Sequence, residues 1–380
     1  MHKIKIAALS ALALTLSGCG ASDKPAAPPQ KTAEELAYIS DTSPIGKARL
    51  DAVISPLFDD PAMVETRALL IMHRGEIIAE RYGEDYDEDT RFISWSMAKS
   101  FTGALIGFLV ADGRLVLDDP APVPAWQRPG DPRGHITLRQ LLHMSSGLDH
   151  TETAEENGKT IYEADTQQML FLDGSSDMAG YAEARPMEAE PGAKFEYSTA
   201  TSLILADIIT RTLTKSTDPK VRRNTAMRFI RGRLLEPLDM DSTYFEFDAN
   251  GTFIGGSIIN ATARDYAKFG EFLRNNGAKK GAQHLPVSWV KFMRTSSAND
   301  PAYGGHIWLN KKRPKGRNQV LFPDMAPDTA FAALGHLGQQ IIVSPEQKLT
   351  IVRLGKTQDD VIQPMSDQIG RIVALFPVGK

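Results

Sequence analysis

The motif Ser96-Met97-Ala98-Lys99 opens a long apolar stretch at residues 100–110. A Ser and a Lys three positions apart lie on one face of a helix, about one turn from each other. The apolar residues that follow recur at helical spacing and cover the helix nearly all round, which is typical of a buried central helix. The sequence therefore predicts a fold built around this helix, with Ser96 and Lys99 at its buried mouth.

These two residue types suit acyl transfer. A serine hydroxyl is a poor nucleophile until a base takes its proton, and a lysine held among apolar groups has a lowered pKa and can be that base. The helix N-terminus also directs unpaired backbone N–H groups at whatever binds there. We therefore expect a nucleophile at Ser96 and its base at Lys99.

The spacing alone is weak evidence, because Ser288-Trp289-Val290-Lys291 shares it. A short stretch follows Ser288 and soon reaches a polar break, which indicates a surface helix. We expect the second pair to be solvated and without function.

The first residues resemble a bacterial export leader. Lys3 and Lys5 precede an apolar run at residues 6–16, which is too short to span a bilayer. The run ends in Leu16-Ser17-Gly18-Cys19, which resembles a lipobox, in which the Cys is lipidated and becomes the first mature residue. We expect a lipoprotein signal peptide at residues 1–18 and a membrane anchor at Cys19, with an ordinary signal peptide as the alternative.

A tether rich in Ala, Pro, Lys and Gln follows at residues 19–43, so the folded part should begin near Ser43. Gly20 stands where an Asp would signal retention in the inner membrane. By the same resemblance we expect a lipoprotein of the bacterial cell envelope, on the outer membrane and facing the periplasm.

Composition limits the remaining classes of function. The chain has 380 residues, of which 42% are hydrophobic and 24% charged, enough for one large or two intermeshed globular domains. A net charge of −4 argues against nucleic acid as a partner. Cys19 is the single cysteine, so thiol catalysis and thiolate metal sites are excluded from the mature chain. The scattered His residues form no metal-ligand pattern, and we expect neither a metal nor a cofactor.

The order of expected elements indicates an α/β fold of the α+β kind. A hairpin is expected at residues 67–82. One helix is expected after the capping box at Thr137, and two more at residues 200–213 and 262–273. Strands are then expected at residues 304–309, 329–335, 339–344 and 348–354, before a last helix at 359–376. This order predicts an α/β domain from residues 44–115 and 251–380, with a mostly helical domain inserted at 116–250. A ligand should bind between them.

Four motifs carry a family resemblance: Ser96-Met-Ala-Lys99, Thr137-Leu-Arg-Gln-Leu-Leu-His-Met-Ser-Ser-Gly-Leu148, Pro191-Gly-Ala-Lys-Phe-Glu-Tyr197 and Gly335-His-Leu-Gly338. In this order they resemble the serine β-lactamase and penicillin-binding-protein superfamily over about residues 44–376. The chain is most similar to the class C-related esterases and amidases, including the 6-aminohexanoate-dimer hydrolases. The resemblance implies a β-lactamase/transpeptidase-like fold, an antiparallel sheet flanked by helices.

The second family motif, Tyr-x-Asn, falls on Tyr197-Ser198-Thr199. The resemblance implies that Tyr197 relays protons to the leaving group together with Lys99. Thr199 departs from the pattern, since the usual Asn amide is missing, and is expected to face substrate.

The third motif, Lys-Thr-Gly in classical members, falls on His336-Leu337-Gly338. His336 is expected to face the site, and Gly338 to let substrate approach the strand backbone. The backbone N–H groups of Ser96 and Gln339 are implied as the oxyanion hole. Lys356-Thr357-Gln358 is a rival by composition that lacks the Gly.

Other polar residues are weaker candidates. Asp149, His150 and Asp173 lie in an irregular stretch expected to form a cleft wall, where they would touch substrate. His143 is expected to make a structural contact below the cleft.

The sequence therefore predicts a lipid-anchored serine hydrolase that cleaves a small ester or amide through an acyl-enzyme on Ser96. The alternatives are a β-lactamase or D-Ala-D-Ala carboxypeptidase, and a non-catalytic binding lipoprotein on the same fold.

Overall fold

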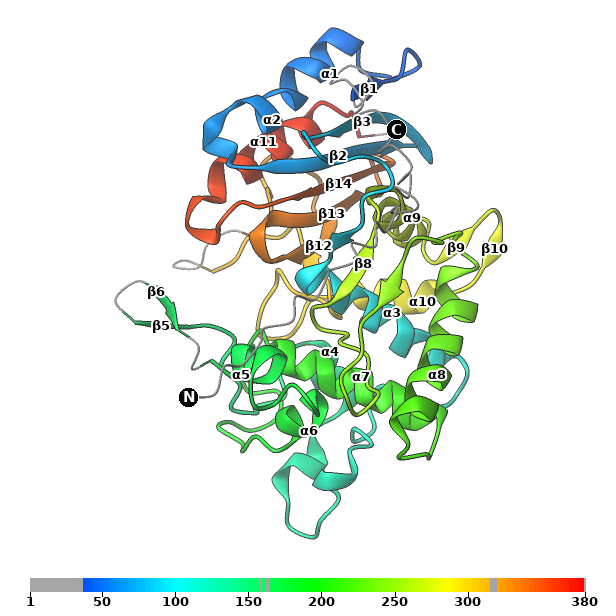
Figure 1. Cartoon of the computed structure of the whole chain (residues 1–380), viewed down its shortest axis with the longest axis vertical. Coiled ribbons are helices and arrows are strands. Elements are labelled where there is room, and N and C mark those ends of the chain that lie inside the picture. The colour runs from blue at the N-terminus through cyan, green and yellow to red at the C-terminus, as the bar shows by residue number, and fades with distance from the viewer. Residues whose placement is uncertain (1–36, 157–158, 162–163, 315–319, 379–380) are drawn as a thin grey trace, which may run out of the picture. The chain divides into compact units, whose positions relative to one another are not determined.

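The largest sheet in the computed structural model has seven antiparallel strands in the order β1-β3-β2-β14-β13-β12-β11 (Figure 1). The structure describes residues 37–156, 159–161, 164–314 and 320–378, so the expected leader and Cys19 lie outside the described residues. The seven strands are β1 Ala37–Ile39, β2 Thr66–His73, β3 Glu76–Tyr82, β11 Trp308–Leu309, β12 Phe331–Gly335, β13 Gln339–Ser344 and β14 Leu349–Gly355.

The β2–β3 hairpin turns at Arg74 and Gly75, whose φ angles of 57° and 89° suit a two-residue hairpin connection. β14 pairs with β2 and places Val352 opposite Leu70, so strands from distant parts of the chain build one sheet. Strand pairing already begins at β1, earlier than the expected start near Ser43.

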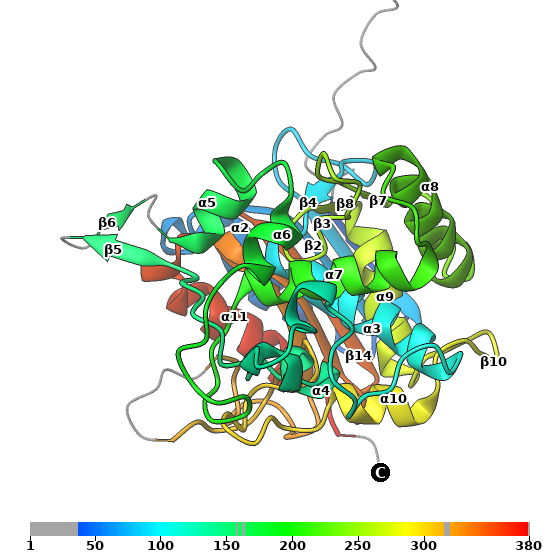
Figure 2. The ribbon, with the colours of Figure 1, turned by 90° about the horizontal axis from the view of Figure 1, so that it is seen from below.

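Alternate side chains of these strands enter two separate cores, because successive residues of a strand point to opposite faces. Leu69 and Ile71 pack with the helices α1 (Lys47–Ile54) and α11 (Gln363–Ala374). Ala68 and Leu70 belong to the larger core, which contains α9 (Ala263–Arg274) and α3 (Ala98–Ala111) (Figure 2). The sheet is therefore covered by helices on both faces.

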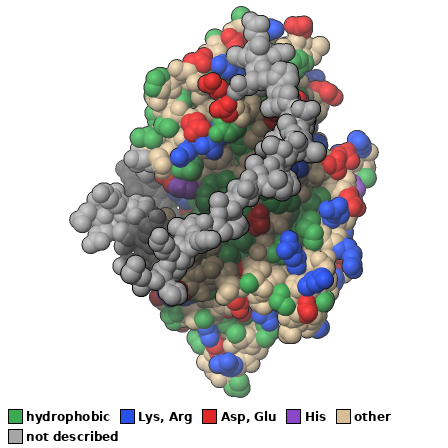
Figure 3. Space-filling view, viewed as in Figure 1, with side chains coloured by type: hydrophobic (Ala, Val, Ile, Leu, Met, Phe, Trp, Pro, Cys, Tyr) green, Lys and Arg blue, Asp and Glu red, His purple; other side chains and the backbone are tan. Residues whose placement is uncertain are grey.

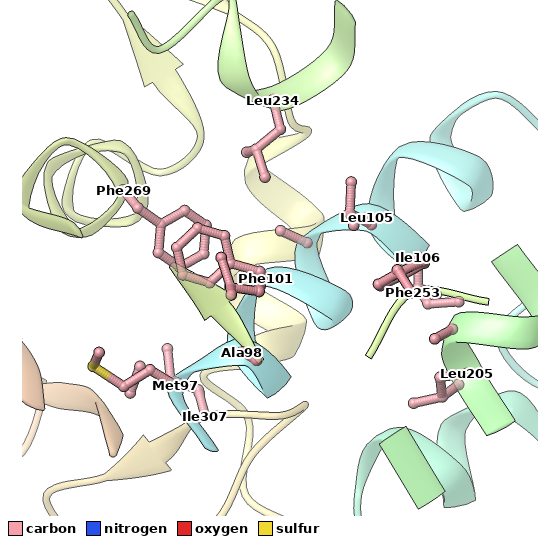
Figure 4. Close-up of a cluster of buried hydrophobic side chains, with 14 of the residues drawn as sticks. Met97, Ala98, Phe101, Leu105, Ile106, Leu205, Leu234, Phe253, Phe269 and Ile307 are labelled. Atoms are coloured by element: carbon pink, nitrogen blue, oxygen red, sulfur yellow. The ribbon is translucent and has the colours of Figure 1, made fainter. Parts of the chain in front are cut away.

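Helix α3 is the buried helix that the sequence predicts. Its residues 98–109 are all buried, and a 3₁₀ turn at Trp95–Met97 leads into it. Phe101 stacks on Phe269 of α9 at 3.8 Å between ring centroids (Figure 4). On another side, Trp289 donates a hydrogen bond to the carbonyl oxygen of Gly103, so α3 is held by packing around its circumference.

The second Ser-x-x-Lys pair lies on α10 (Val287–Met293), and Ser288 and Lys291 are both exposed there. Trp289 between them faces the core, and a Cβ atom at Gly107 of α3 would lie 2.2 Å from its Nε1 atom. The pair therefore marks a surface helix, in agreement with the sequence prediction.

The segment between the two halves of the sheet is mostly helical. Its capping box is present, since Thr137 and Gln140 exchange hydrogen bonds with each other's backbone N–H groups. The irregular stretch after it contains two short helices and a hairpin that the sequence analysis did not predict. The elements are α4 Leu138–Leu142, β5 Ala154–Glu156, β6 Lys159–Ile161, α5 Asp165–Phe171, α6 Met178–Glu183, α7 Thr199–Leu213 and α8 Pro219–Ile230.

Helix α8 was also not predicted, because its sequence is dominated by polar residues. Only Arg222, Ala226 and Ile230 of this helix are buried. On the face drawn in Figure 3, Lys and Arg side chains gather over α8.

Smaller elements complete the described chain: α2 Pro56–Asp59, a three-stranded sheet of β4 Phe92–Ile93, β8 Ile259–Ala261 and β7 Tyr244–Phe245, and a hairpin of β9 Ala278–Lys279 and β10 Ala282–Gln283. The strand expected at residues 304–309 is reduced to β11, because His306 adopts a φ of 60° and interrupts the extended backbone. Among the described helices, none combines the length and apolar character needed to cross a bilayer.

Candidate active site

Ser96 and Lys99 lie together at the start of α3. The Lys99 Nζ atom is 2.9 Å from the Ser96 Oγ atom. Trp95, directly before the serine, has a φ of 44°, a region that L-residues rarely adopt. A strained residue beside a candidate nucleophile is common at active sites.

The amine of Lys99 is enclosed by oxygen atoms from distant parts of the chain. Lys99 is 2% exposed, and its Nζ atom also lies 2.8 Å from Thr199 Oγ1 and 2.9 Å from the carbonyl oxygen of Gly256. Burial lowers the pKa of Lys99 to about 8, although the charge of Glu152 acts in the opposite direction. A substantial fraction of this amine is therefore neutral near pH 8 and able to accept a proton.

Thr199 is the first residue of α7, after Ser198, whose hydroxyl accepts a hydrogen bond from the Thr201 N–H group. The Thr199 hydroxyl donates to Glu152 Oε1 at 2.7 Å. Thr199 is 1% exposed, and its hydroxyl is held between Lys99 and Glu152. A contact between Thr199 and substrate stays a prediction.

Tyr197 lies beside the same amine. The Lys99 Nζ atom is 4.9 Å from the centre of its ring, and the same ring stacks on Trp308 at 5.3 Å between ring centroids. Burial, together with the charge of Glu152, raises the pKa of Tyr197, while a hydrogen bond with Ser96 opposes the rise. The phenol therefore stays protonated at neutral pH, next to the candidate nucleophile.

The turn between β12 and β13 approaches the serine closely. A Cβ atom at Gly335 would lie 2.3 Å from the carbonyl oxygen of Ser94, so a larger residue does not fit there. The Gln339 side chain donates to the carbonyl oxygens of His336, Leu337 and Gly355 and fixes the turn. The backbone of Gln339 is thus held beside the segment that carries Ser96.

Gly338 packs against a buried arginine. It is buried with a φ of 78°, and an added Cβ would lie 2.7 Å from a guanidinium nitrogen of Arg353. The glycine therefore allows the turn to close on Arg353 inside the protein, and the approach of substrate at Gly338 stays a prediction. Arg353 donates to the carbonyl oxygens of Leu337 and Gly338.

His336 lies at the outer edge of this turn with its side chain 48% exposed. Its ring is edge-on to Trp95 at 5.5 Å, which places it next to the serine segment. Its Nδ1 atom is 3.3 Å from Asp359 Oδ2, so an acidic group already accompanies this imidazole. The rival motif is structural at Thr357, whose hydroxyl donates to the Met63 carbonyl and accepts from Arg353.

The weaker candidates lie outside the hydrogen-bonded set of Ser96, Lys99 and Thr199. Asp149 pairs with Arg185 at 3.8 Å, and Asp173 is exposed. His150 is 2% exposed and bonded to the Ala182 carbonyl, which corrects the expectation that it touches substrate. His143 is 7% exposed and stacks on a phenylalanine ring, a structural contact of the kind predicted.

Sequence reasoning missed Glu152, Trp308 and Arg353. Glu152 has no motif of its own and sits in a stretch that reads only as polar and irregular. A buried arginine beside the Gly335 motif has no signal in a single sequence. Among the described residues, no group of three or more His, Cys, Asp or Glu side chains is placed to hold a metal ion.

Comparison with known proteins finds a family model and several relatives that match this chain. Residues 57–367 match the family model described as Beta-lactamase. The chain is 26% identical over 255 residues to the 6-aminohexanoate-dimer hydrolase of Paenarthrobacter ureafaciens, covering 64% of this chain and 61% of that enzyme. It is 29% identical over 175 residues to esterase EstB of Burkholderia gladioli, covering 41% of this chain and 43% of the esterase. Each match thus spans less than two thirds of the relative's length.

Solved structures give the same result for the fold. A Bacillus anthracis protein that bears the provisional name 6-aminohexanoate-dimer hydrolase superposes with a TM-score of 0.64 at 25% identity, covering 85% of this chain and 83% of that one. A family VIII carboxylesterase superposes with a TM-score of 0.61 at 15% identity, covering 85% and 95%. The β-lactamase/transpeptidase-like fold predicted from the sequence is confirmed.

The burial of the Lys99 amine leads to a prediction about how the free energy of unfolding depends on pH. Folding lowers the pKa of Lys99 from 10.5 to about 8, so the unfolded chain binds more protons between these values and stability rises with pH across that window. Between pH 7 and pH 10, the free energy of unfolding of the wild type should rise relative to that of Lys99→Met by about 2–3 kcal/mol. Denaturant titrations at the two pH values measure this difference.

The matched control is Lys291→Met, which removes the exposed lysine of the second pair. Its free energy of unfolding should follow that of the wild type between the same pH values. If Lys99→Met also follows the wild type, the amine is not buried as described.

Proposed function

The chain belongs to the beta-lactamase family, and we propose that within it the protein is a serine hydrolase that cleaves ester or amide bonds through an acyl-enzyme on Ser96. The observation that carries this proposal is the 2.9 Å contact between Ser96 Oγ and a lysine amine that is 2% exposed. Relatives named 6-aminohexanoate-dimer hydrolase and esterase EstB support the choice of ester or amide over other bonds.

In the proposed first step, Ser96 Oγ attacks the substrate carbonyl carbon while its proton passes to Lys99. The lowered pKa of Lys99, about 8, supports this assignment, since a general base works best when its pKa is near the working pH. The negative charge that develops on the carbonyl oxygen would be held by the backbone N–H groups of Ser96 and Gln339. One such donor contributes roughly 3–4 kcal/mol to the transition state.

In the second step the tetrahedral intermediate collapses, and Tyr197 passes its proton to the departing alcohol or amine while it takes up the proton that Lys99 received from Ser96. The raised pKa of Tyr197 keeps the phenol protonated until this step, so Tyr197 can relay a proton but does not persist as a phenolate. Water then attacks the acyl-Ser96 ester, with Lys99 and Tyr197 again moving the protons, and releases the acid.

Removing the nucleophile tests the proposal. Ser96→Ala should keep the circular dichroism spectrum and lower the hydrolysis of p-nitrophenyl butyrate by at least about a thousandfold. Ser288→Ala is the matched control and should leave the rate unchanged, since that serine lies exposed on α10. Wild-type turnover by Ser96→Ala would rule out the assignment, and failure of a fluorophosphonate probe to label the wild type would favour a non-catalytic binding protein.

We propose further that esters are preferred to β-lactams. Thr199 and His336 stand where classical β-lactamases carry Asn and Lys, and here the first is buried against Glu152 while the second is accompanied by Asp359. Each lost hydrogen bond to a charged group costs roughly 1.5–3 kcal/mol. The kcat/KM for p-nitrophenyl butyrate should therefore exceed that for nitrocefin by at least about a hundredfold.

Steady-state rates for both substrates, each corrected with the Ser96→Ala variant, measure this ratio. Comparable efficiencies would move the protein to the β-lactamases, and release of D-Ala from a D-Ala-D-Ala peptide would support a carboxypeptidase.

Membrane attachment is a separate proposal, based on the lipobox-like sequence that ends at Cys19. We propose a lipoprotein of the bacterial outer membrane that faces the periplasm. Cys19→Ala should shift the protein from the membrane fraction to the soluble fraction, or leave its signal peptide uncleaved, and should abolish labelling by a palmitate analogue. An unlabelled wild-type protein in the soluble fraction would contradict the proposal.

A further inference from the structure

We propose that Glu152 is a positioning residue that orients the Thr199 hydroxyl and thereby aims the lone pair of Lys99 at Ser96. The inference rests on the proposed function, in which Lys99 accepts the proton of Ser96. It adds a residue that no sequence motif marks, and it gives the departure from Tyr-x-Asn at Thr199 a chemical role.

Thr199 donates hydrogen bonds from both its N–H group and its hydroxyl to Glu152. Glu152 Oε2 accepts from the Thr199 N–H group at 2.5 Å and from the Thr166 hydroxyl at 2.9 Å, while Oε1 accepts from the Thr199 hydroxyl at 2.7 Å. An ionised carboxylate only accepts hydrogen bonds. The single hydroxyl hydrogen of Thr199 is therefore committed to Glu152, and its oxygen is left to accept.

The contacts of the Lys99 amine leave one direction for its lone pair. A neutral lysine has two N–H hydrogens and one lone pair. Thr199 Oγ1 at 2.8 Å must accept, and the carbonyl oxygen of Gly256 at 2.9 Å can only accept, so both N–H hydrogens are used. The remaining contact is with Ser96 Oγ at 2.9 Å, and the lone pair points there. Without Glu152 the Thr199 hydroxyl could donate to that lone pair and compete with Ser96.

The Glu152 carboxylate comes from a different segment of the chain than Thr199 and Lys99. Glu152 belongs to the segment after α4, whereas Thr199 opens the 15-residue helix α7. The Thr199 N–H is one of the first helical N–H groups, which have no partner inside the helix, and a negative charge is stabilised at this end. Glu152 therefore joins a third segment to the two that carry Thr199 and Lys99.

The charges around the amine make the inference testable through pH. The Tyr197 ring faces Lys99 at 4.9 Å and is kept protonated by its raised pKa. His306 is also near, but burial lowers its pKa to about 3, so it is neutral. Glu152 is the charged neighbour, and its negative charge raises the pKa of Lys99 against the effect of burial.

Glu152→Gln keeps the shape and removes the charge. Because the base must be neutral, kcat/KM rises with pH through the pKa of Lys99, and loss of the charge should move this acid limb to lower pH by roughly half to one unit. The rate on the plateau should fall about tenfold, because an amide no longer holds the hydroxyl hydrogen in one direction. The pH profile of p-nitrophenyl butyrate hydrolysis measures both effects.

Glu152→Asp keeps the charge on a shorter side chain and should lower the plateau while leaving the limb near its wild-type pH. Thr199→Val removes the hydroxyl through which Glu152 acts on Lys99. In that background, adding Glu152→Gln should lower the plateau of kcat/KM by less than twofold. Glu190→Gln, which changes an exposed carboxylate elsewhere in this region, is the matched control and should change neither quantity.

A plateau that falls in Glu152→Gln while the acid limb stays in place would show a purely structural role and overturn the inference. Full additivity of Glu152→Gln and Thr199→Val would overturn it as well. These outcomes are distinguishable from failure of the proposed function, which is tested by Ser96→Ala. If Ser96→Ala is inactive but the acid limb of the kcat/KM profile does not move in Glu152→Gln, only the positioning role is refuted.

Discussion

A buried lysine amine is the group on which the arrangement of the site depends. An ammonium or amine that is 2% exposed is unstable in a protein unless oxygen atoms replace the water it has lost. Three such atoms surround Lys99, from Ser96, Thr199 and Gly256, which lie on three separate segments of the chain. The same burial that makes these contacts necessary lowers the pKa of the amine and makes it a base near neutral pH.

The apolar helix α3 makes this burial possible. Its side chains pack on all sides, as in the stack of Phe101 on Phe269 and the contact of Trp289 with Gly107. A helix held this firmly fixes Lys99 in its first turn and Ser96 in the 3₁₀ turn that leads into it. The partner groups on α7 and on the turn at Gly256 are held by the same core, so little reorganisation is needed when a substrate binds.

Backbone conformations that are unfavourable for residues with a side chain lie near Ser96, and one of them is stabilised by hydrogen bonds from buried side chains. Trp95 has a φ of 44° and Leu337 a φ of 61°, both costly for residues with a side chain. Arg353, which is fully buried, and Gln339 hold the turn at Leu337 through several hydrogen bonds to its carbonyl oxygens. The rigidity of this turn is what would keep a backbone N–H group in place for a developing oxyanion.

The sequence by itself determined the buried helix, the hairpin at Arg74-Gly75, the capping box and the order of motifs, because each depends on residues close together in the chain. It also identified Ser96, Lys99 and Tyr197, which the structure brings together. Tertiary structure alone decided that Glu152 reaches Thr199, that Gly338 closes on Arg353, and that His150 is buried. These outcomes depend on contacts between residues 15 to 47 positions apart, and one sequence holds no local pattern for such contacts.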